Sequence, residues 1–130
     1  MAGLLEGEGC FTLIRQSNYA SRSSYRRAAV FCNMTDEDVV RHLQQLVGIG
    51  RITFLRNKRK PNHKPTWRWR VEGPPAIKLM EELLPHMFSR RSNRIREVIT
   101  VHAAERIRGK EAQRAWALTL NARRRGRRGR

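Results

Sequence analysis

The stretch that decides the fold is the opening nine residues, Met1–Gly9, which read MAGLLEGEG. Its leucines give one apolar side, and the pattern predicts a short helix from Met1 to Glu8. Gly3 and Gly7 stand four residues apart and therefore share one face of that helix. A face without side chains lets another helix approach closely. That helix belongs either to a second copy of the chain, in a two-fold contact, or to the same domain, and both readings stay open here.

The charge of the chain indicates its class of partner. The 130 residues suffice for one compact domain, and Lys and Arg number 28 against 11 Asp and Glu, a net charge of +17. Self-repulsion at that charge opposes folding, so we expect a polyanionic partner, with nucleic acid first and an acidic membrane surface second. No apolar run approaches the roughly 20 residues of a membrane helix and no secretory leader is recognisable, so we expect a soluble intracellular protein, cytoplasmic or nucleoid-associated.

Cysteine and histidine give no sign of a metal or redox site. Cys10 and Cys32 are too few for a disulfide scaffold or a zinc site. The four histidines share no ligand spacing with each other or with the cysteines. We therefore expect reduced structural thiols, no metal bound by His or Cys, and no organic cofactor.

Periodicity and turn residues predict an α+β domain with the element order α-β-β-α-β-β-α-α. Thr35 is a candidate helix cap, and Gly48 and Gly50 end the helix that follows it. The expected strands are residues 10–16, 25–34, 52–55 and 66–72, and the later helices are one from Pro74 and two at 92–108 and 110–120.

These elements predict three parts of the chain. Residues 1–109 form the core, residues 110–120 a C-terminal helix, and residues 121–130 a basic tail that is disordered when free. We expect this tail to add sequence-independent, salt-sensitive affinity for nucleic acid.

The run Met1–Gly9, followed by Cys10 and Phe11, resembles the signature of the LAGLIDADG homing endonucleases. The expected element order also matches the core of that family, so the resemblance covers about residues 1–109. It implies the single-motif, homodimeric type, with a four-stranded antiparallel DNA-binding saddle and helices on one face. The implied activity is intron-encoded, site-specific cutting of both strands of DNA at a long pseudo-palindromic site, in a bacterial, phage or organellar host.

The resemblance also implies a shared metal site. In the family the second acidic residue of the motif and the carbonyl before it bind divalent metal, and the matching positions are Glu8, where relatives usually have Asp, and Gly7. Mg²⁺ or Mn²⁺ would support phosphodiester hydrolysis, with Ca²⁺ as a substitute that does not support cleavage. Gly3, Leu4 and Gly7 would form the dimer interface, and Glu6 would be structural.

Two further roles in the family have candidates here. A basic residue near the start of a later helix completes the site in relatives; Arg90 is our first choice and Arg91 the second, for charge stabilisation at the scissile phosphate. A polar residue at the end of the second strand often positions water, and Asn33, Met34 and Thr35 all stay open for that role.

Strand alternation predicts the DNA-reading face. If the apolar positions pack on the helices, the opposite face carries Thr12, Ile14, Gln16, Arg27, Ala29, Arg51, Thr53, Leu55, Arg68 and Arg70. Basic residues of the two hairpin regions are expected to reach flanking DNA: Arg22, Arg26, Arg56, Lys58, Arg59 and Lys60.

Two other functions fit the same fold. One is a DNA-binding protein or repressor that does not cut, although such a protein gains nothing from paired Glu8 carboxylates near phosphate. The other is an RNA maturase that helps an intron to fold, which the sequence leaves open as an added activity.

Overall fold

The computed structural model describes residues 1–18, 23–56, 59–60 and 62–129. Its elements confirm the α+β prediction and follow the expected order up to the last helix. They are α1 (Ala2–Glu8), β1 (Gly9–Asn18), β2 (Ser23–Met34), α2 (Glu37–Val47), β3 (Arg51–Leu55), β4 (Thr66–Glu72), α3 (Pro74–Leu83), the 3₁₀ turn η1 (Leu84–His86) and α4 (Ser89–Arg128).

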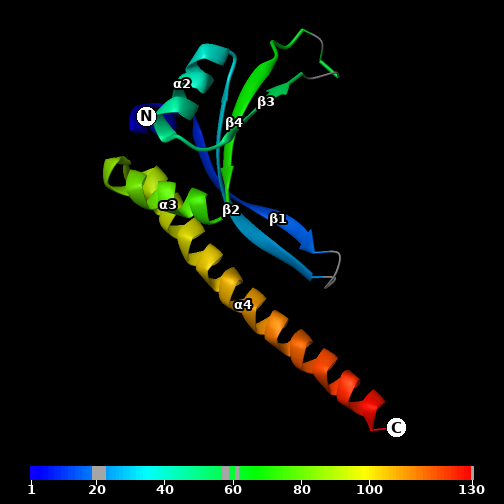
Figure 1. Ribbon diagram of the computed structural model, residues 1–130. Coiled ribbons are helices and arrows are strands. Elements are labelled where there is room, and N and C mark those ends of the chain that lie inside the picture. Colours follow the sequence, from blue (N-terminus) through cyan, green and yellow to red (C-terminus); the bar gives the residue numbers. More distant parts are fainter. Residues whose placement is uncertain (19–22, 57–58, 61, 130) are drawn as a thin grey trace.

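The four strands form one antiparallel sheet in the order β1-β2-β4-β3. Phe11 of β1 pairs with Val30 of β2, and Val30 in turn pairs with Val71 of β4. The helices pack against one face of this sheet and leave the other face bare (Figure 1). This arrangement is the predicted saddle with helices on one side.

The core lies between the sheet and the helices. Trp69 of β4 is fully buried, as the strict alternation of β4 predicts, and its indole Nε1 donates to the Ile49 carbonyl at 3.0 Å. A side chain on Gly50 would place its Cβ 2.2 Å from that nitrogen, and Gly50 also has a φ of 110°. The turn before β3 therefore requires glycine at this position.

Helix α4 is held to the sheet by polar side chains as well as by apolar packing. Arg94 donates from Nε to the Phe11 carbonyl at 3.0 Å, and Arg108 donates to the Ser24 carbonyl at 3.2 Å. Between them, His102 accepts a hydrogen bond at Nδ1 from the Ala28 N–H at 3.1 Å. These spacings place one polar stripe of the helix along the backbone of β1 and β2.

The structure differs from the prediction in the C-terminal region. Helix α4 begins at Ser89 and runs unbroken for 40 residues to Arg128, through the expected break at 109 and the expected tail. Nothing among the described residues lies within 4 Å of a Cβ built on Gly109, and one exposed glycine costs a helix only about 1 kcal/mol. The limit of the core at residue 109 stays a prediction.

Two smaller points concern helix ends and length. The N-cap of α2 is Asp36 rather than Thr35, and its side chain makes no capping hydrogen bond. Within the described ranges, no helix is both long enough and apolar enough to cross a membrane.

We predict that the free energy of unfolding falls as the pH is lowered through the titration range of His102. Burial first, and then the charges of Arg106 and Arg27, lower the pKa of this imidazole in the folded protein. The unfolded chain, with a pKa of about 6.5, therefore takes up the proton first. The stabilisation is present above that pH and is lost as the pH falls through the folded pKa, where Nδ1 can no longer accept from Ala28.

Urea unfolding between pH 7.5 and pH 5 measures this effect. His102→Gln keeps an acceptor without the titration and should flatten the pH dependence, whereas His42→Gln, at an exposed site on α2, should leave it unchanged. Equal slopes for the wild type and His102→Gln would contradict the assignment.

Candidate active site

Helix α1 presents two different faces. Leu5 points into the core and is fully buried, while Leu4 is half-buried. On the other face, a Cβ built on Gly3 or Gly7 meets no atom of the described residues within 4 Å. Among the described residues, the glycine face therefore contacts no other element, which favours the reading in which a second helix approaches it from outside the chain.

The last turn of α1 is tied to the first turn of α4. The carbonyls at a helix end have no partner within the helix. Arg91 supplies donors to two of them, from Nε to the Glu6 carbonyl at 3.0 Å and from Nη2 to the Gly7 carbonyl at 3.3 Å. In return, the Glu6 carboxylate accepts the backbone N–H of Phe88, the N-cap residue of α4, at 3.2 Å. Glu6 thus has the structural role expected of it.

Glu8 ends α1 and is exposed. The next residue, Gly9, begins β1 opposite Cys32 of β2, so Glu8 lies at the end of that strand. Its charge raises the pKa of the buried Cys32 thiol, although burial is the larger cause. Gly9 has no room for a side chain, because a Cβ there would lie 2.4 Å from the Leu5 carbonyl oxygen. This close turn directs the chain from the motif helix into the sheet.

The three candidates for positioning water lie in different surroundings. Asn33 is exposed on the bare face, where its Oδ1 accepts from Nε of Arg68 at 2.9 Å. Met34 is half-buried and packs against the core. Thr35 is exposed in the turn before α2. Asn33 alone of the three combines an exposed amide with a position on the bare face.

The two arginines at the start of α4 also differ. Arg91 is half-buried and engaged with the motif carbonyls, whereas Arg90 is exposed and makes no hydrogen bond or ion pair with the described residues. The structure therefore brings Arg91 to the motif and leaves the guanidinium of Arg90, our first choice, directed to solvent.

One chain supplies an incomplete set of metal ligands. Within the part of the chain that the structure describes, no three His, Cys, Asp or Glu side chains gather closely enough to hold a metal ion. The Glu8 carboxylate and the Gly7 carbonyl are hard oxygen donors of the kind that Mg²⁺ prefers. Both groups could serve as ligands for such an ion.

The register places all ten predicted reading residues on the bare face. Thr12 pairs with Ala29, Ile14 with Arg27, and Thr53 with Arg68. The remaining four are Gln16, Arg51, Leu55 and Arg70. Ala29 is a partial exception, since neighbouring side chains bury it completely and it offers nothing to a partner.

Arginines crowd the middle of this face. The guanidinium groups of Arg68 and Arg70 lie 5.2 Å and 5.1 Å from the ring centroid of Phe31, which pairs with Arg70 on the neighbouring strand β2. Arg70 also pairs with Glu72. Burial first, and then the nearby charges of Arg68, Arg27 and Arg51, lower the pKa of Arg70. Nothing in the sequence marks Phe31 for this face, because an aromatic residue in a strand is usually part of the core.

The basic residues predicted to reach flanking DNA lie in different surroundings. Arg26 shares its face with Ala28 and Val30, so it lies on the helix side, where its backbone N–H and its guanidinium bind Glu105. The structure thus gives Arg26 a partner within the chain, and its expected contact with DNA stays a prediction. Three residues are exposed near the β3–β4 connection: Arg56, Arg59 and Lys60. Two lie outside the described residues: Arg22 and Lys58.

Comparison with known proteins identifies a family and several similar structures. The family model described as LAGLIDADG endonuclease matches residues 1–96. A search of curated proteins finds no match. Among solved structures, the homing endonuclease I-CvuI, in complex with its target, has a TM-score of 0.62 at 18% identity, over 80% of this chain and 64% of that one.

Two other solved structures are similar. The homing endonuclease I-TnaI has a TM-score of 0.64 at 17% identity, over 85% of this chain and 74% of that one. The meganuclease I-AabMI, bound to uncleaved DNA, has a TM-score of 0.62 at 15% identity, over 90% of this chain but 39% of that one. At these identities the structural matches show the fold, and the family model shows the relationship: the chain belongs to the LAGLIDADG endonuclease family.

Proposed function

We propose that the chain is one subunit of a homodimeric homing endonuclease that cuts double-stranded DNA at a long, pseudo-palindromic site with the help of a divalent metal. The observation that carries this proposal is the exposed Glu8 carboxylate at the end of a helix whose glycine face is open. A carboxylate in that place is half of a site, and the open face is where the other half would join.

The open face of α1 favours pairing with its own copy. Gly3 and Gly7 allow close approach, and Leu4 and the exposed Met1 supply apolar surface beside them. Both sheets must face the same duplex, so the two helices meet with their Glu8 ends on the DNA side. The match to I-AabMI supports this pairing, because a chain of which one such domain covers only 39% has room for two.

The bare face favours DNA as the partner. Burial first, and then the charges of Arg68, Arg27 and Arg51, lower the pKa of Arg70, and a polyanion relieves the repulsion among these charges. Arginine pairs with guanine and glutamine with adenine in the major groove, so these residues with Gln16 suit base reading.

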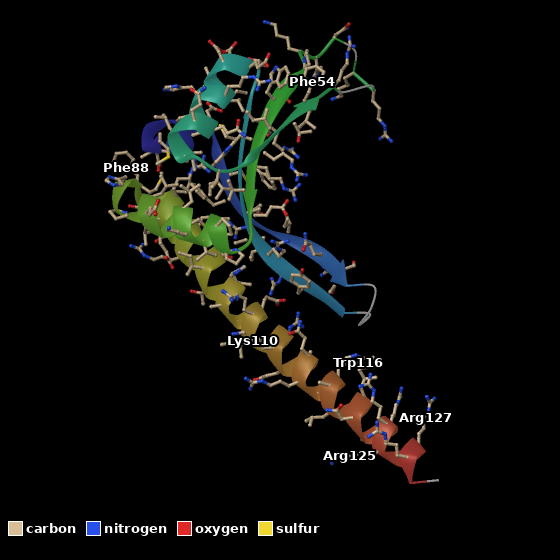
Figure 2. All side chains as sticks on the ribbon, viewed as in Figure 1. Phe54, Phe88, Lys110, Trp116, Arg125 and Arg127 are labelled. Atoms are coloured by element: carbon tan, nitrogen blue, oxygen red, sulfur yellow. The ribbon has the colours of Figure 1, made fainter. Side chains whose placement is uncertain are left out.

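The distal part of α4 offers a second, less specific contact. Beyond Glu105 every described residue of the helix is exposed, and the arm extends past the ends of β1 and β2 (Figure 1). Lys110, Trp116, Arg125 and Arg127 project from it without covering any other element (Figure 2). We assign this arm to salt-sensitive contact with DNA phosphates, the role predicted for the tail.

The proposed metal-dependent hydrolysis follows from bringing two Glu8 carboxylates together. Two Glu8 carboxylates at one interface repel each other unless cations neutralise them. The Glu8 carboxylates and Gly7 carbonyls would hold Mg²⁺, which when bound lowers the pKa of water and stabilises a leaving oxygen. Arg90, exposed on the first turn of α4, would stabilise charge on the scissile phosphate. The amide of Asn33 would orient water.

We predict that Glu8→Gln abolishes cleavage and retains binding. Wild-type protein incubated with a DNA library should cut a subset of sequences with Mg²⁺ and none with EDTA. Glu8→Gln should retain the same fragments in a filter-binding assay and cut them at least about a hundredfold more slowly, because the amide cannot replace the carboxylate as a metal ligand. Glu111→Gln, an equal change on the exposed arm, should cut normally.

The same experiment separates the alternatives. Retention of DNA by both proteins, with no cleavage by the wild type under any metal, would contradict the endonuclease and favour a non-cleaving binder. Preferential retention of folded intron RNA over duplex DNA would favour a maturase.

We predict that Gly3→Leu prevents dimerisation without unfolding the chain. Leucine is a better helix former than glycine by about 1 kcal/mol, and the space beside Gly3 is open in the single chain. A second α1 on that face would collide with the new side chain. Sedimentation velocity should therefore show a dimer for the wild type and a monomer for Gly3→Leu, with unchanged circular dichroism.

Gly109→Leu provides the matched control, since it makes the same change at an open helical position far from α1. It should remain dimeric. A wild type that is monomeric with and without DNA would contradict the proposed dimer, as would a Gly3→Leu variant that dimerises normally.

A further inference from the structure

Arg91 lies against one of the two atoms that the proposed function assigns to metal. Its Nη2 donates to the Gly7 carbonyl at 3.3 Å while its Nε holds the Glu6 carbonyl at 3.0 Å. The positively charged Arg91 side chain therefore already contacts the Gly7 carbonyl oxygen, which is one of the proposed metal ligands.

Arg91 and a metal ion conflict because of their charges, not because the Gly7 carbonyl oxygen lacks a lone pair for both. A carbonyl oxygen has two lone pairs and can accept a hydrogen bond and a metal bond together. Guanidinium, however, stays protonated at any physiological pH, and two cations a few ångströms apart repel each other. The Glu8 carboxylate carries a single negative charge, which offsets only part of the positive charge that Arg91 and a divalent metal bring together.

The surroundings of Arg91 fix its position. Two adjacent carbonyls take two donors of its planar group, and the Glu6 carboxylate, bound to the N–H of Phe88, holds the same turn of backbone. Arg91 is half-buried, whereas the neighbouring Arg90 is exposed. Of the two arginines, only Arg91 is placed to act on the Gly7 carbonyl.

We propose that Arg91 is a positioning residue that holds the end of α1 and also keeps divalent metal weakly bound until DNA arrives. The phosphates of a bound duplex bring negative charge to this end of the helix. They offset the guanidinium charge, so metal binds tightly only in the DNA complex. This inference rests on the proposed function, and it makes metal loading follow target binding.

Metal binding to the DNA-free protein tests the proposal without any cleavage. The measurement is the free Mn²⁺ concentration, by electron paramagnetic resonance, in titrations of the wild type, Arg91→Gln and Arg91→Lys. Glutamine keeps a donor for the carbonyl and removes the charge, so Arg91→Gln should bind Mn²⁺ roughly tenfold more tightly than the wild type. Lysine keeps the charge, so Arg91→Lys should bind as weakly as the wild type.

Two controls make the result specific. Arg90→Gln removes the same charge one residue away and should tighten Mn²⁺ binding much less. Glu8→Gln combined with Arg91→Gln should remove the tight binding, which shows that the signal comes from this site. A folded Arg91→Gln that binds Mn²⁺ no more tightly than the wild type would overturn the proposal, as would equal tightening by Arg90→Gln.

Failure of the proposed role of Arg91 and failure of the proposed endonuclease give different results. A wild type that cuts the library, with no gain in Mn²⁺ affinity in Arg91→Gln, refutes the role of Arg91 and leaves the endonuclease intact. A wild type that never cuts refutes the endonuclease, while the titrations still decide whether Arg91 opposes metal at Gly7.

Discussion

The joint between the end of α1 and the start of α4 is the constraint on which the rest of the structure depends. Three hydrogen bonds make it: two from Arg91 to the carbonyls of Glu6 and Gly7, and one from the Phe88 N–H to the Glu6 carboxylate. A helix of seven residues is too short to be stable alone. Fixed at this end, α1 buries Leu5 and turns its glycine face and Glu8 outward.

Three surface features of the single chain support the proposed dimer on DNA. Its glycine face contacts none of the residues that the structure describes outside α1, and its acidic motif supplies one carboxylate beside one carbonyl. On the bare face, burial first and then the charges of Arg68, Arg27 and Arg51 lower the pKa of Arg70. Each feature is compatible with the proposed dimer on DNA, in which a second copy and a polyanion would complement it.

Sequence reasoning succeeded where one periodicity decides the outcome. Alternation along β4, anchored on Trp69, placed Arg68 and Arg70 on the bare face, and the register confirms it. It does not decide where a choice depends on tertiary contact. Neighbouring residues on a helix point about 100° apart, and sequence alone does not tell which of Arg90 and Arg91 meets the motif. The polar stripe of α4, including buried His102, looks in sequence like a solvated charged face, and the unbroken α4 reflects the small cost of its two glycines, Gly109 and Gly126.

The central claim is that two chains share one catalytic site built from two copies of Glu8. Subunit mixing tests it most directly. Wild-type and Glu8→Gln chains are refolded together in varying ratios, and total phosphodiester hydrolysis, nicks plus double-strand breaks, is measured. A shared site predicts that the rate falls as the square of the wild-type fraction, to about one quarter at equal amounts of the two chains. A rate that falls in proportion to the wild-type fraction would show that each chain cuts alone and would contradict the account.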